Sequence, residues 1–169
     1  MDTILNLGLN EKTVEGFAEQ TKNPRFSWDS YRRFIQLFGK VVFGVNDEKF
    51  DHVLDDAKEK QGVTDDSKLS VESLKSIVSK YKKICEEHTK RKFPDTPNEQ
   101  LVLSIEAVFK SWMGERAIVY REKNNITKDI ANGTAVNVVT MVFGNMGDDS
   151  ATGVVFTRNG HNGKKEIEG

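Results

Sequence analysis

Apolar side chains recur every three or four residues over most of the span from residue 10 to residue 112, and this period restricts the span to amphipathic α-helices. The first four helices are expected to begin near the capping residues Asn10, Ser27 or Asp29, Asp47 and Ser70. Helices that each carry one apolar face pack together as a bundle. The side chains expected to face the shared core are Val14, Phe17, Ala18, Tyr31, Phe34, Ile35, Phe38, Val41, Val42, Phe50, Val53, Leu54, Ala57, Leu74, Ile77, Val78, Tyr81, Ile84 and Cys85.

The clearest helix start is Thr96-Pro97-Asn98-Glu99, which has the pattern of a capping box with proline at the first helical position. In such a box, Thr96 and Glu99 satisfy each other's backbone donors. Gly114 marks a stop or a bend, and a shorter helix is expected over residues 117–120. The buried stripe of the longer helix is expected to comprise Leu101, Ile105, Val108, Phe109 and Trp112.

The composition changes after Asn125. Residues 133–143 are rich in Val and Thr, as a buried strand would be, and residues 153–157 form a second strand candidate. The predicted fold class is therefore α+β: a mainly helical bundle followed by a small antiparallel sheet fragment. Two or three strands without a covering helix are marginal in water, so either the bundle covers them or a partner segment is missing.

Composition excludes several functional classes. The 25 basic and 26 acidic residues give a formal charge of -1, which predicts no nucleic-acid partner and no attraction to an anionic membrane. The single cysteine, Cys85, cannot form an internal disulfide, and no Cys and His pair has zinc-site spacing, so a reducing cytosolic setting is expected. No export signal and no apolar run of membrane-spanning length are visible in the sequence.

A loop of small and polar residues separates the two expected strands and reads GNMGDDSATG over residues 144–153. Glycines let successive N–H groups point into one concavity, and Ser150 and Thr152 add hydroxyl donors, so this 144–153 loop can cradle phosphate oxygens. It is not a P-loop, because no Gly-Lys-Ser/Thr follows and no helix opens behind it. Composition alone favours a plain hairpin turn, and Asp148 and Asp149 would repel phosphate unless they face away or meet a metal ion.

Other polar residues give weaker signals. Arg158 can clamp a phosphate, although an arginine at the end of a strand is more often solvated or paired at the surface. His52, His88 and His161 are scattered, and none has the neighbours of a nucleophile or a metal site. The sequence therefore assigns no catalytic residue and no metal ligand.

Several blocks of the chain resemble pyruvate, phosphate dikinases, in the order and with the spacing of that family. They read MDTILNLGLN over residues 1–10, NPRFSWDSYRRFI over 23–35, AVFKSW over 107–112, RAIVYR over 116–121, GTAVNV over 133–138, and MVFGNMGDDSATGV with FTRN over 141–159. Together the blocks cover nearly the whole chain. The resemblance is therefore much more specific than a glycine-rich loop alone.

The resemblance implies a partial nucleotide-binding region of an N-terminal domain of ATP-grasp type. In that family the domain phosphorylates a histidine on a swivelling central domain, which passes the phosphoryl group to pyruvate on a C-terminal barrel. The overall reaction converts ATP, pyruvate and phosphate to AMP, phosphoenolpyruvate and diphosphate. The implied cofactor is ATP with Mg²⁺, and the implied partners are ATP and the remaining domains of the dikinase. A cytoplasmic location is implied, with an organellar one in some members.

For this chain, the resemblance implies that the 144–153 loop covers the ATP phosphates. The implied phosphate-binding residues are Gly144, Asn145, Gly147, Ser150, Thr152, Gly153 and Arg158. Gly160 replaces a proline of the family pattern and Lys164 an acid, and the first change is expected to loosen the turn after Arg158. The nucleotide-binding lysine and arginine of the family are expected before Met1, and its Mg²⁺-binding carboxylates after Gly169.

The implied domain division has four parts. Residues 1–9 end a first ATP-grasp segment, 10–96 form a helical subdomain, 97–132 connect it to the nucleotide-binding lobe, and 133–169 begin an incomplete second lobe. Such a region is expected to be inactive alone. The alternative hypothesis is a stand-alone helical interaction module that has lost nucleotide chemistry and binds a partner through a face of the bundle.

Overall fold

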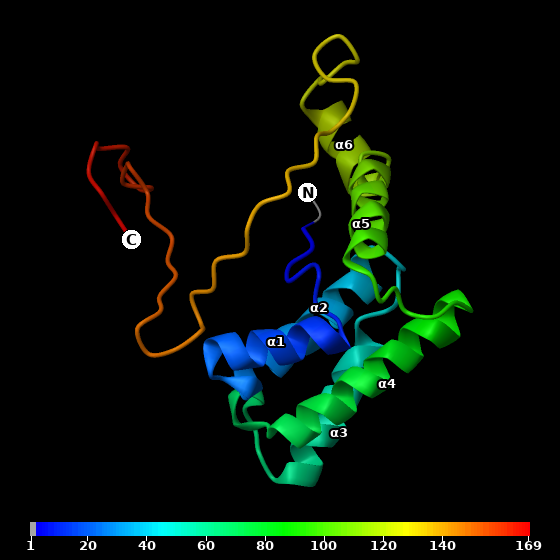
Figure 1. Cartoon of the computed structure of the whole chain (residues 1–169). Coiled ribbons are helices and arrows are strands. Elements are labelled where there is room, and N and C mark those ends of the chain that lie inside the picture. The colour runs from blue at the N-terminus through cyan, green and yellow to red at the C-terminus, as the bar shows by residue number, and fades with distance from the viewer. Residues whose placement is uncertain (1–2) are drawn as a thin grey trace. The chain divides into compact units, whose positions relative to one another are not determined.

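The computed structural model describes residues 3–169, and helices are the regular elements of this part of the chain (Figure 1). In order, they are α1 (Glu11–Thr21), α2 (Pro24–Val41), α3 (Glu48–Gln61), the short 3-10 helix η1 (Asp66–Lys68), α4 (Val71–Thr89), α5 (Pro97–Ser111) and α6 (Glu115–Lys123). The chain divides into two compact units, one that ends at Val139 and one over Thr140–Gly169. The first unit contains all of these helices.

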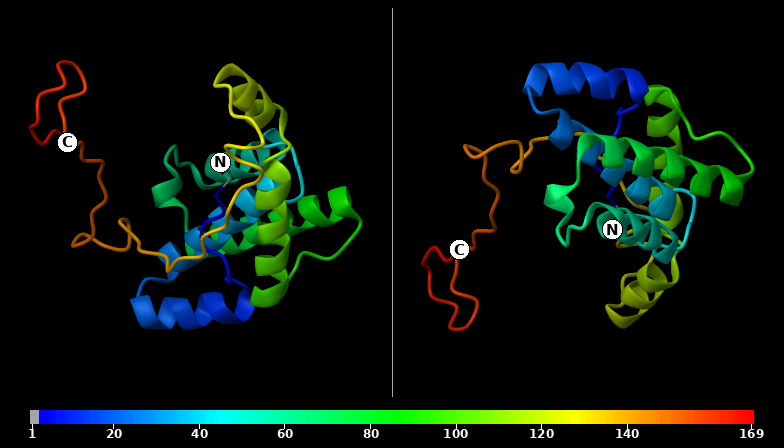
Figure 2. Two further views of the ribbon diagram at one scale, coloured as in Figure 1. Left: turned by 90° about the horizontal axis from the view of Figure 1, so that it is seen from above. Right: turned by 90° about the horizontal axis from the view of Figure 1, so that it is seen from below.

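Helix α2 is the centre of the bundle. It packs against both α1 and α4, and α3 packs against α4 (Figures 1 and 2). Tyr31, Phe34, Ile35 and Phe38 of α2 are fully buried, as the helical period predicts. The same α2 stripe ends in Val41 and Val42, which were expected in the core but remain half-buried.

Side-chain caps begin several of the helices, but not all at the expected residues. Helix α2 begins at Pro24 with Asn23 as its cap, before the expected Ser27 or Asp29, and Asp47 makes no side-chain cap bond at α3. Asn10 Oδ1 accepts hydrogen bonds from the N–H groups of Lys12 and Thr13, and Thr13 Oγ1 accepts one from the Asn10 N–H, which completes a capping box at α1. Thr96 caps α5 through the N–H of Glu99 at 3.2 Å, with Pro97 at the first helical position as predicted. Within residues 3–169 the Glu99 side chain does not return a bond to the Thr96 N–H, so the expected capping box is only half formed. These bonds satisfy donors that the first helical turn leaves unpaired.

Gly39 lets α2 approach α3 and α4 closely. A Cβ atom at this position would lie 2.6 Å from Cζ of Phe50 and 2.9 Å from Sγ of Cys85. Both neighbours are fully buried, so neither side chain has free space into which it can move. The packing of the three helices therefore depends on the absence of a side chain at residue 39.

An ionic cluster centred on the buried pair Asp29 and Arg32 joins α2 to the connection between α3 and α4. Arg32 donates from Nε and Nη2 to Oδ1 of Asp29 at 2.9 and 2.6 Å, and its Nη2 lies 3.5 Å from Oδ2 of Asp66 in η1. Arg33 binds the other Asp29 oxygen at 2.9 Å, and Arg25 donates to the Asp66 carbonyl oxygen at 2.6 Å. Paired charges of this kind are the form in which buried charge is tolerated.

Gln100 attaches α5 to the segment that precedes α1. Its Oε1 accepts a hydrogen bond from the Gly8 N–H at 2.9 Å, and its Nε2 donates to the carbonyl oxygens of Leu9 and Pro94, both at 3.0 Å. The side chain is completely buried.

By contrast Phe109, which was expected in the buried stripe of α5, is 52% exposed, so that part of the stripe prediction is wrong.

The predicted antiparallel sheet fragment is wrong, and with it the α+β fold class. Among residues 3–169 there is no strand; an isolated bridge pairs Phe156 with Glu168, with N···O distances of 2.7 and 3.1 Å. The Val-rich residues 133–143 have the composition of a strand but no neighbouring strand to receive their hydrogen bonds. Strand propensity depends on such a neighbour, whereas a helix satisfies its backbone locally. The described fold is therefore helical.

None of the helices in the described part of the chain combines the length and the apolar character that crossing a membrane requires.

Candidate phosphate-binding loop

The 144–153 loop lies in the unit Thr140–Gly169 and is folded back on itself by a tight turn. The N–H of Ser150 donates to the carbonyl oxygen of Gly147 at 3.0 Å, which closes the turn over Asp148 and Asp149. Gly144 and Ser150 are half-buried. The predicted site residues of the loop that are exposed are Asn145, Gly147, Thr152 and Gly153.

Gly144 is where the two arms of the loop meet. A Cβ atom there would lie 2.5 Å from Cβ of Thr152 and 3.0 Å from the carbonyl carbon and oxygen of Ala151. Contacts below 3.0 Å force a shift, and backbone atoms have little freedom to move aside. Gly144 is therefore required for this loop shape, which brings it next to Thr152.

Several backbone donors of the loop remain available to a ligand. Within residues 3–169, the N–H groups of Gly147, Thr152 and Gly153 have no hydrogen-bond partner, and the hydroxyl groups of Ser150 and Thr152 have none either. Exposed N–H and hydroxyl groups on small residues are the donors that phosphate oxygens accept from. The loop can therefore offer such donors to an anion.

Arg158 lies outside the loop and belongs to a second turn. Its Nη1 donates to the carbonyl oxygen of Gly163 at 3.2 Å, and the side chain is exposed. Asn159 closes this turn: its Oδ1 accepts from the N–H groups of His161 and Asn162 at 2.9 and 3.0 Å, and its carbonyl oxygen accepts from the Gly163 N–H. The guanidinium group is thus held on the turn and not directed by contacts to the 144–153 loop.

Gly160 supplies a bond that the proline of the family pattern cannot make. Its N–H donates to Oε2 of Glu168 at 3.1 Å, next to the bridge between Phe156 and Glu168. The turn after Arg158 is therefore closed by side chains of this chain, although its sequence departs from the family pattern. The role of Asn159 was not predicted from the sequence, although the dipeptide Asn159-Gly160 is a turn signature.

The acidic pair of the loop does not form a metal centre. Asp148 and Asp149 are both exposed, and the described residues contain no group of three His, Cys, Asp or Glu side chains that could hold a metal ion. His52, His88 and His161 are also exposed. The donor set of the described chain therefore does not fit a complete Mg²⁺ site.

Comparison with known proteins gives one consistent result. The family model described as "Pyruvate phosphate dikinase, AMP/ATP-binding domain" matches residues 1–168. The protein named "Pyruvate, phosphate dikinase" of Entamoeba histolytica is 52% identical over 169 residues, which is 100% of this chain and 19% of that protein. The protein of the same name from Clostridium symbiosum is 52% identical over 170 residues, again 100% of this chain and 19% of the relative.

A plant relative is similar to the chain over the same length. The protein named "Pyruvate, phosphate dikinase 1, chloroplastic" of Arabidopsis thaliana is 50% identical over 169 residues, which is 100% of this chain and 17% of that protein. The chain therefore spans less than a fifth of the length of the curated relatives it matches.

Proposed function

Because the chain belongs to the pyruvate phosphate dikinase AMP/ATP-binding domain family, we propose that it supplies part of an ATP site, in which the 144–153 loop covers the nucleotide phosphates. The match of the family model over residues 1–168 is the observation that carries this proposal. A family match assigns the class of ligand. The geometry of the loop supports the choice of residues that bind that ligand.

The geometry of the loop supports phosphate as the group it binds. Gly144 allows its arm to approach Thr152, and the unpaired N–H groups of Gly147, Thr152 and Gly153 lie on the exposed part of the loop. We assign these groups, with Asn145 and Ser150, to phosphate oxygens. No lysine lies within residues 144–153, so backbone dipoles and hydroxyl groups supply the attraction.

Arg158 is proposed as the positive charge of the site. In the described structure its guanidinium uses one donor on the Gly163 carbonyl oxygen, which leaves further donors for a phosphate. We propose that Mg²⁺ binds together with the nucleotide, coordinated by its phosphates, because the described residues offer no cluster of three metal ligands. Asp148 and Asp149 are proposed to face away from the phosphates.

The proposal for the whole protein follows from its relatives. We assign the chain to a dikinase that converts ATP, pyruvate and phosphate to AMP, phosphoenolpyruvate and diphosphate, with an ATP-grasp-type nucleotide site completed by other parts of the protein. Residues 10–96 are the proposed helical subdomain, and residues 97–132 its connection to the nucleotide-binding part. A cytoplasmic location is proposed from the single cysteine, and chloroplastic relatives extend the family to an organelle.

An NMR titration of the chain with ATP and Mg²⁺ tests the site. We expect the largest amide shift changes at Gly144, Gly147 and Gly153, with weak affinity because much of the site lies outside these residues. Gly144→Ala should abolish the changes by forcing the arms of the loop apart. Gly133→Ala is the matched control, since a Cβ there meets nothing within 4 Å. Loop amides that stay unchanged on addition of ATP would contradict the proposal.

Dikinase activity needs a separate experiment. In a chimera, this chain replaces the matching segment of the Clostridium symbiosum relative, to which it is 52% identical. We expect measurable formation of phosphoenolpyruvate from ATP, pyruvate and phosphate, and a strong loss with Gly144→Ala. Equal activity of the chimera with and without Gly144→Ala would show that the loop does not act on the phosphates.

A second candidate function is a helical interaction module, and α5 is the observation that favours it. Val102 and Phe109 of α5 are 55% and 52% exposed, and Met113, just after the helix, is 67% exposed. A contiguous patch of exposed apolar side chains is a common feature of protein interaction surfaces. This candidate predicts no shift of the loop amides with ATP, so the NMR titration separates the two functions.

A further inference from the structure

Helix α6 is joined to the preceding part of the described chain mainly through its connection to α5. No residue of α6 is buried, and in Figure 1 the helix lies beyond the C-terminal end of α5. Among the α6 side chains of the described structure, Arg121 is the one that makes a hydrogen bond or ring contact with a residue before the helix. The position of α6 therefore depends on few contacts.

Arg121 fastens α6 to the end of α5 by two contacts with one residue. Its Nη1 donates to the carbonyl oxygen of Trp112 at 2.7 Å, and its Cζ lies 4.0 Å from the centroid of the Trp112 ring. Trp112 is the C-cap of α5, where carbonyl oxygens lack helical partners. The Arg121 guanidinium therefore caps α5 and stacks on the indole at the same time. Both side chains are half-buried.

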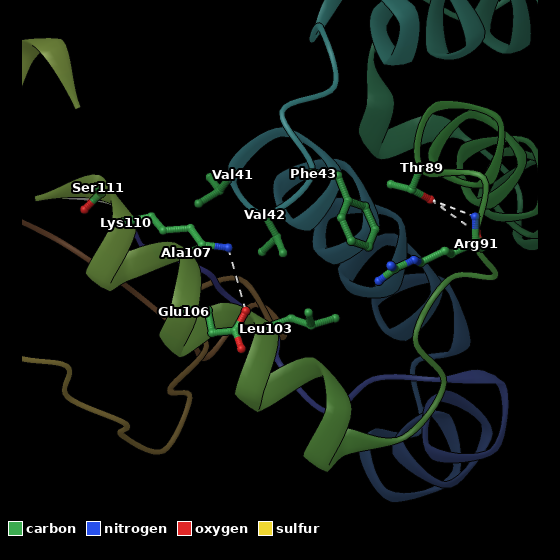
Figure 3. Close-up of a pocket in the computed structure, with 10 residues that line it drawn as sticks. All are labelled: Val41, Val42, Phe43, Thr89, Arg91, Leu103, Glu106, Ala107, Lys110 and Ser111. Atoms are coloured by element: carbon green, nitrogen blue, oxygen red, sulfur yellow. Dashed lines mark hydrogen bonds and ion pairs between the residues drawn. The ribbon is translucent and has the colours of Figure 1, made fainter. Parts of the chain in front are cut away.

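The backbone between the two helices tightens and then becomes extended. The N–H groups of Trp112, Met113 and Gly114 each donate to the carbonyl oxygen three residues earlier, at 3.2, 3.0 and 3.0 Å. A short 3-10 stretch between two helical segments often marks a hinge. Figure 3 shows Ser111, whose carbonyl oxygen accepts the Gly114 N–H, at the end of α5. Gly114 itself has an extended backbone, with φ -68° and ψ 146°, immediately before α6 begins.

The contact between Arg121 and Trp112 exists only while the two helices are bent. In one straight helix over residues 97–123, nine positions would separate the two residues, which is about two and a half turns and about 13 Å along the axis. The two side chains would then lie on opposite faces of the helix. The 2.7 Å bond to the Trp112 carbonyl oxygen therefore identifies the bent state and is lost when the joint straightens.

We propose that the joint over residues 112–114 is a hinge and that Arg121 is its latch. In the described structure the latch is closed and α6 is bent at the end of α5. When Arg121 leaves Trp112, Gly114 takes up helical backbone angles and residues 97–123 become one helix. Straightening breaks no core contact of α6, because none of its residues is buried, and a few backbone dihedral angles absorb the change. This proposal concerns the helices alone and does not depend on the ATP proposal.

Gly114 is the second residue that sets the balance between the two states. Glycine is a poor helix former, so it disfavours the straight helix. In the bent state, a Cβ atom at residue 114 would lie 3.1 Å from the carbonyl oxygen of Ser111, which is a tight contact with backbone. Gly114→Ala should therefore favour the straight helix on both counts.

Distance measurement by electron paramagnetic resonance between spin labels on cysteines at positions 102 and 123 tests the hinge. Val102 and Lys123 are exposed, whereas Cys85 is fully buried and stays unlabelled. A straight helix separates the two labelled positions by about 31 Å along its axis, and a bend shortens that distance. We expect the parent chain to give mainly the shorter distance. Arg121→Gln should raise the ratio of straight to bent chains about tenfold, and Gly114→Ala about fivefold.

Arg116→Gln is the matched control, because it removes the same charge from an exposed position of α6 and should leave the distances unchanged. Acrylamide quenching of tryptophan fluorescence gives an independent measurement. Trp28 is only 7% exposed, so quenching reports mainly on Trp112, and Arg121→Gln should increase it by uncovering the ring.

Three results would overturn the proposal. The first is an unchanged distance in the double variant Gly114→Ala, Arg121→Gln. The second is an equal change in Arg116→Gln. The third is a broad distribution without a component near about 31 Å, which would mean that α6 detaches or unfolds and does not join α5 as one helix.

Discussion

At the residue scale, Gly39 and Gly16 have opposite surroundings although both are glycines inside helices. Gly16 lies in α1, is exposed, and a Cβ there meets nothing within 4 Å. Gly39 is buried against Phe50 and Cys85. The helical period predicts where each glycine lies along its helix, but the contacts of Gly39 come from residues far away in sequence. The sequence alone therefore does not predict that Gly39 contacts other helices and Gly16 does not.

Gly39→Ala is expected to destabilise the chain by about 1–2 kcal/mol. Overpacking of a core costs about 1–3 kcal/mol, and the higher helix propensity of alanine offsets up to about 1 kcal/mol of that cost. Gly16→Ala should instead stabilise it by about 0.5–1 kcal/mol, because only the propensity changes. Urea unfolding followed by circular dichroism measures both variants. A stabilising Gly39→Ala would show that the close approach of the helices is not maintained in solution.

Cys85 is expected to make stability depend on pH above about 9. Burial, with a smaller effect of the Glu86 charge, raises the pKa of the Cys85 thiol from 9.0 to about 12. Between these values the unfolded chain loses a proton that the folded chain keeps, so the free energy of unfolding falls as pH rises. The loss from this thiol between pH 7 and pH 10 is about 1.4 kcal/mol, since one pKa unit corresponds to about 1.36 kcal/mol.

Unfolding in urea at pH 7 and at pH 10 measures this loss, with Cys85→Ala as the comparison. The variant is less stable at pH 7 because it leaves a cavity, but its stability should fall less on raising the pH. Tyrosines with raised pKa values, such as Tyr81, contribute equally to both chains and cancel in the difference. The same pH dependence in the two chains would contradict the assignment to Cys85.

At the scale of elements, prediction from sequence succeeded for the existence of the main helices, where structure is local, although α2 begins before the expected Ser27 or Asp29. The period of Tyr31, Phe34 and Phe38 and the cap at Thr96 predict helices, because each turn is closed by residues three or four positions away. The Val-rich residues 133–143 predicted a strand, and this failed because a strand needs a partner that the composition does not specify. Likewise, the sequence identifies the 144–153 loop by its glycines, but not the contact of Gly144 with Thr152.

Gln100→Leu is expected to weaken the attachment of α5 to the bundle. The substitution leaves the Gly8 N–H and the carbonyl oxygens of Leu9 and Pro94 without their partner, at a cost of about 2–3 kcal/mol. Gln20→Leu on α1 is the matched control, since Gln20 is exposed, and its effect should stay within about 0.5 kcal/mol. Chemical denaturation of the two variants measures the difference. Equal stability would mean that water replaces the three bonds of Gln100.

At the scale of the whole molecule, the chain joins a bundle with a large core to a unit that has little buried apolar surface. Phe34, Phe38 and Tyr81 are fully buried, whereas Val154, Val155 and Ile167 are 71%, 67% and 82% exposed. The free energy that protects backbone hydrogen bonds from opening comes mainly from such burial. The two units should therefore differ in local stability.

Hydrogen exchange followed by NMR measures that difference. Amides of α2 and α4 should exchange slowly, at rates set by unfolding of the bundle, and most amides of residues 140–169 should exchange close to the rate of an unprotected peptide. Phe156 and Glu168 should be moderately protected, because their N–H groups donate across the bridge. Glu168→Pro removes one of these donors and should speed exchange at Phe156 without affecting α2. Slow exchange at similar rates throughout both units would show that residues 140–169 gain stabilising contacts in solution that the described structure does not contain.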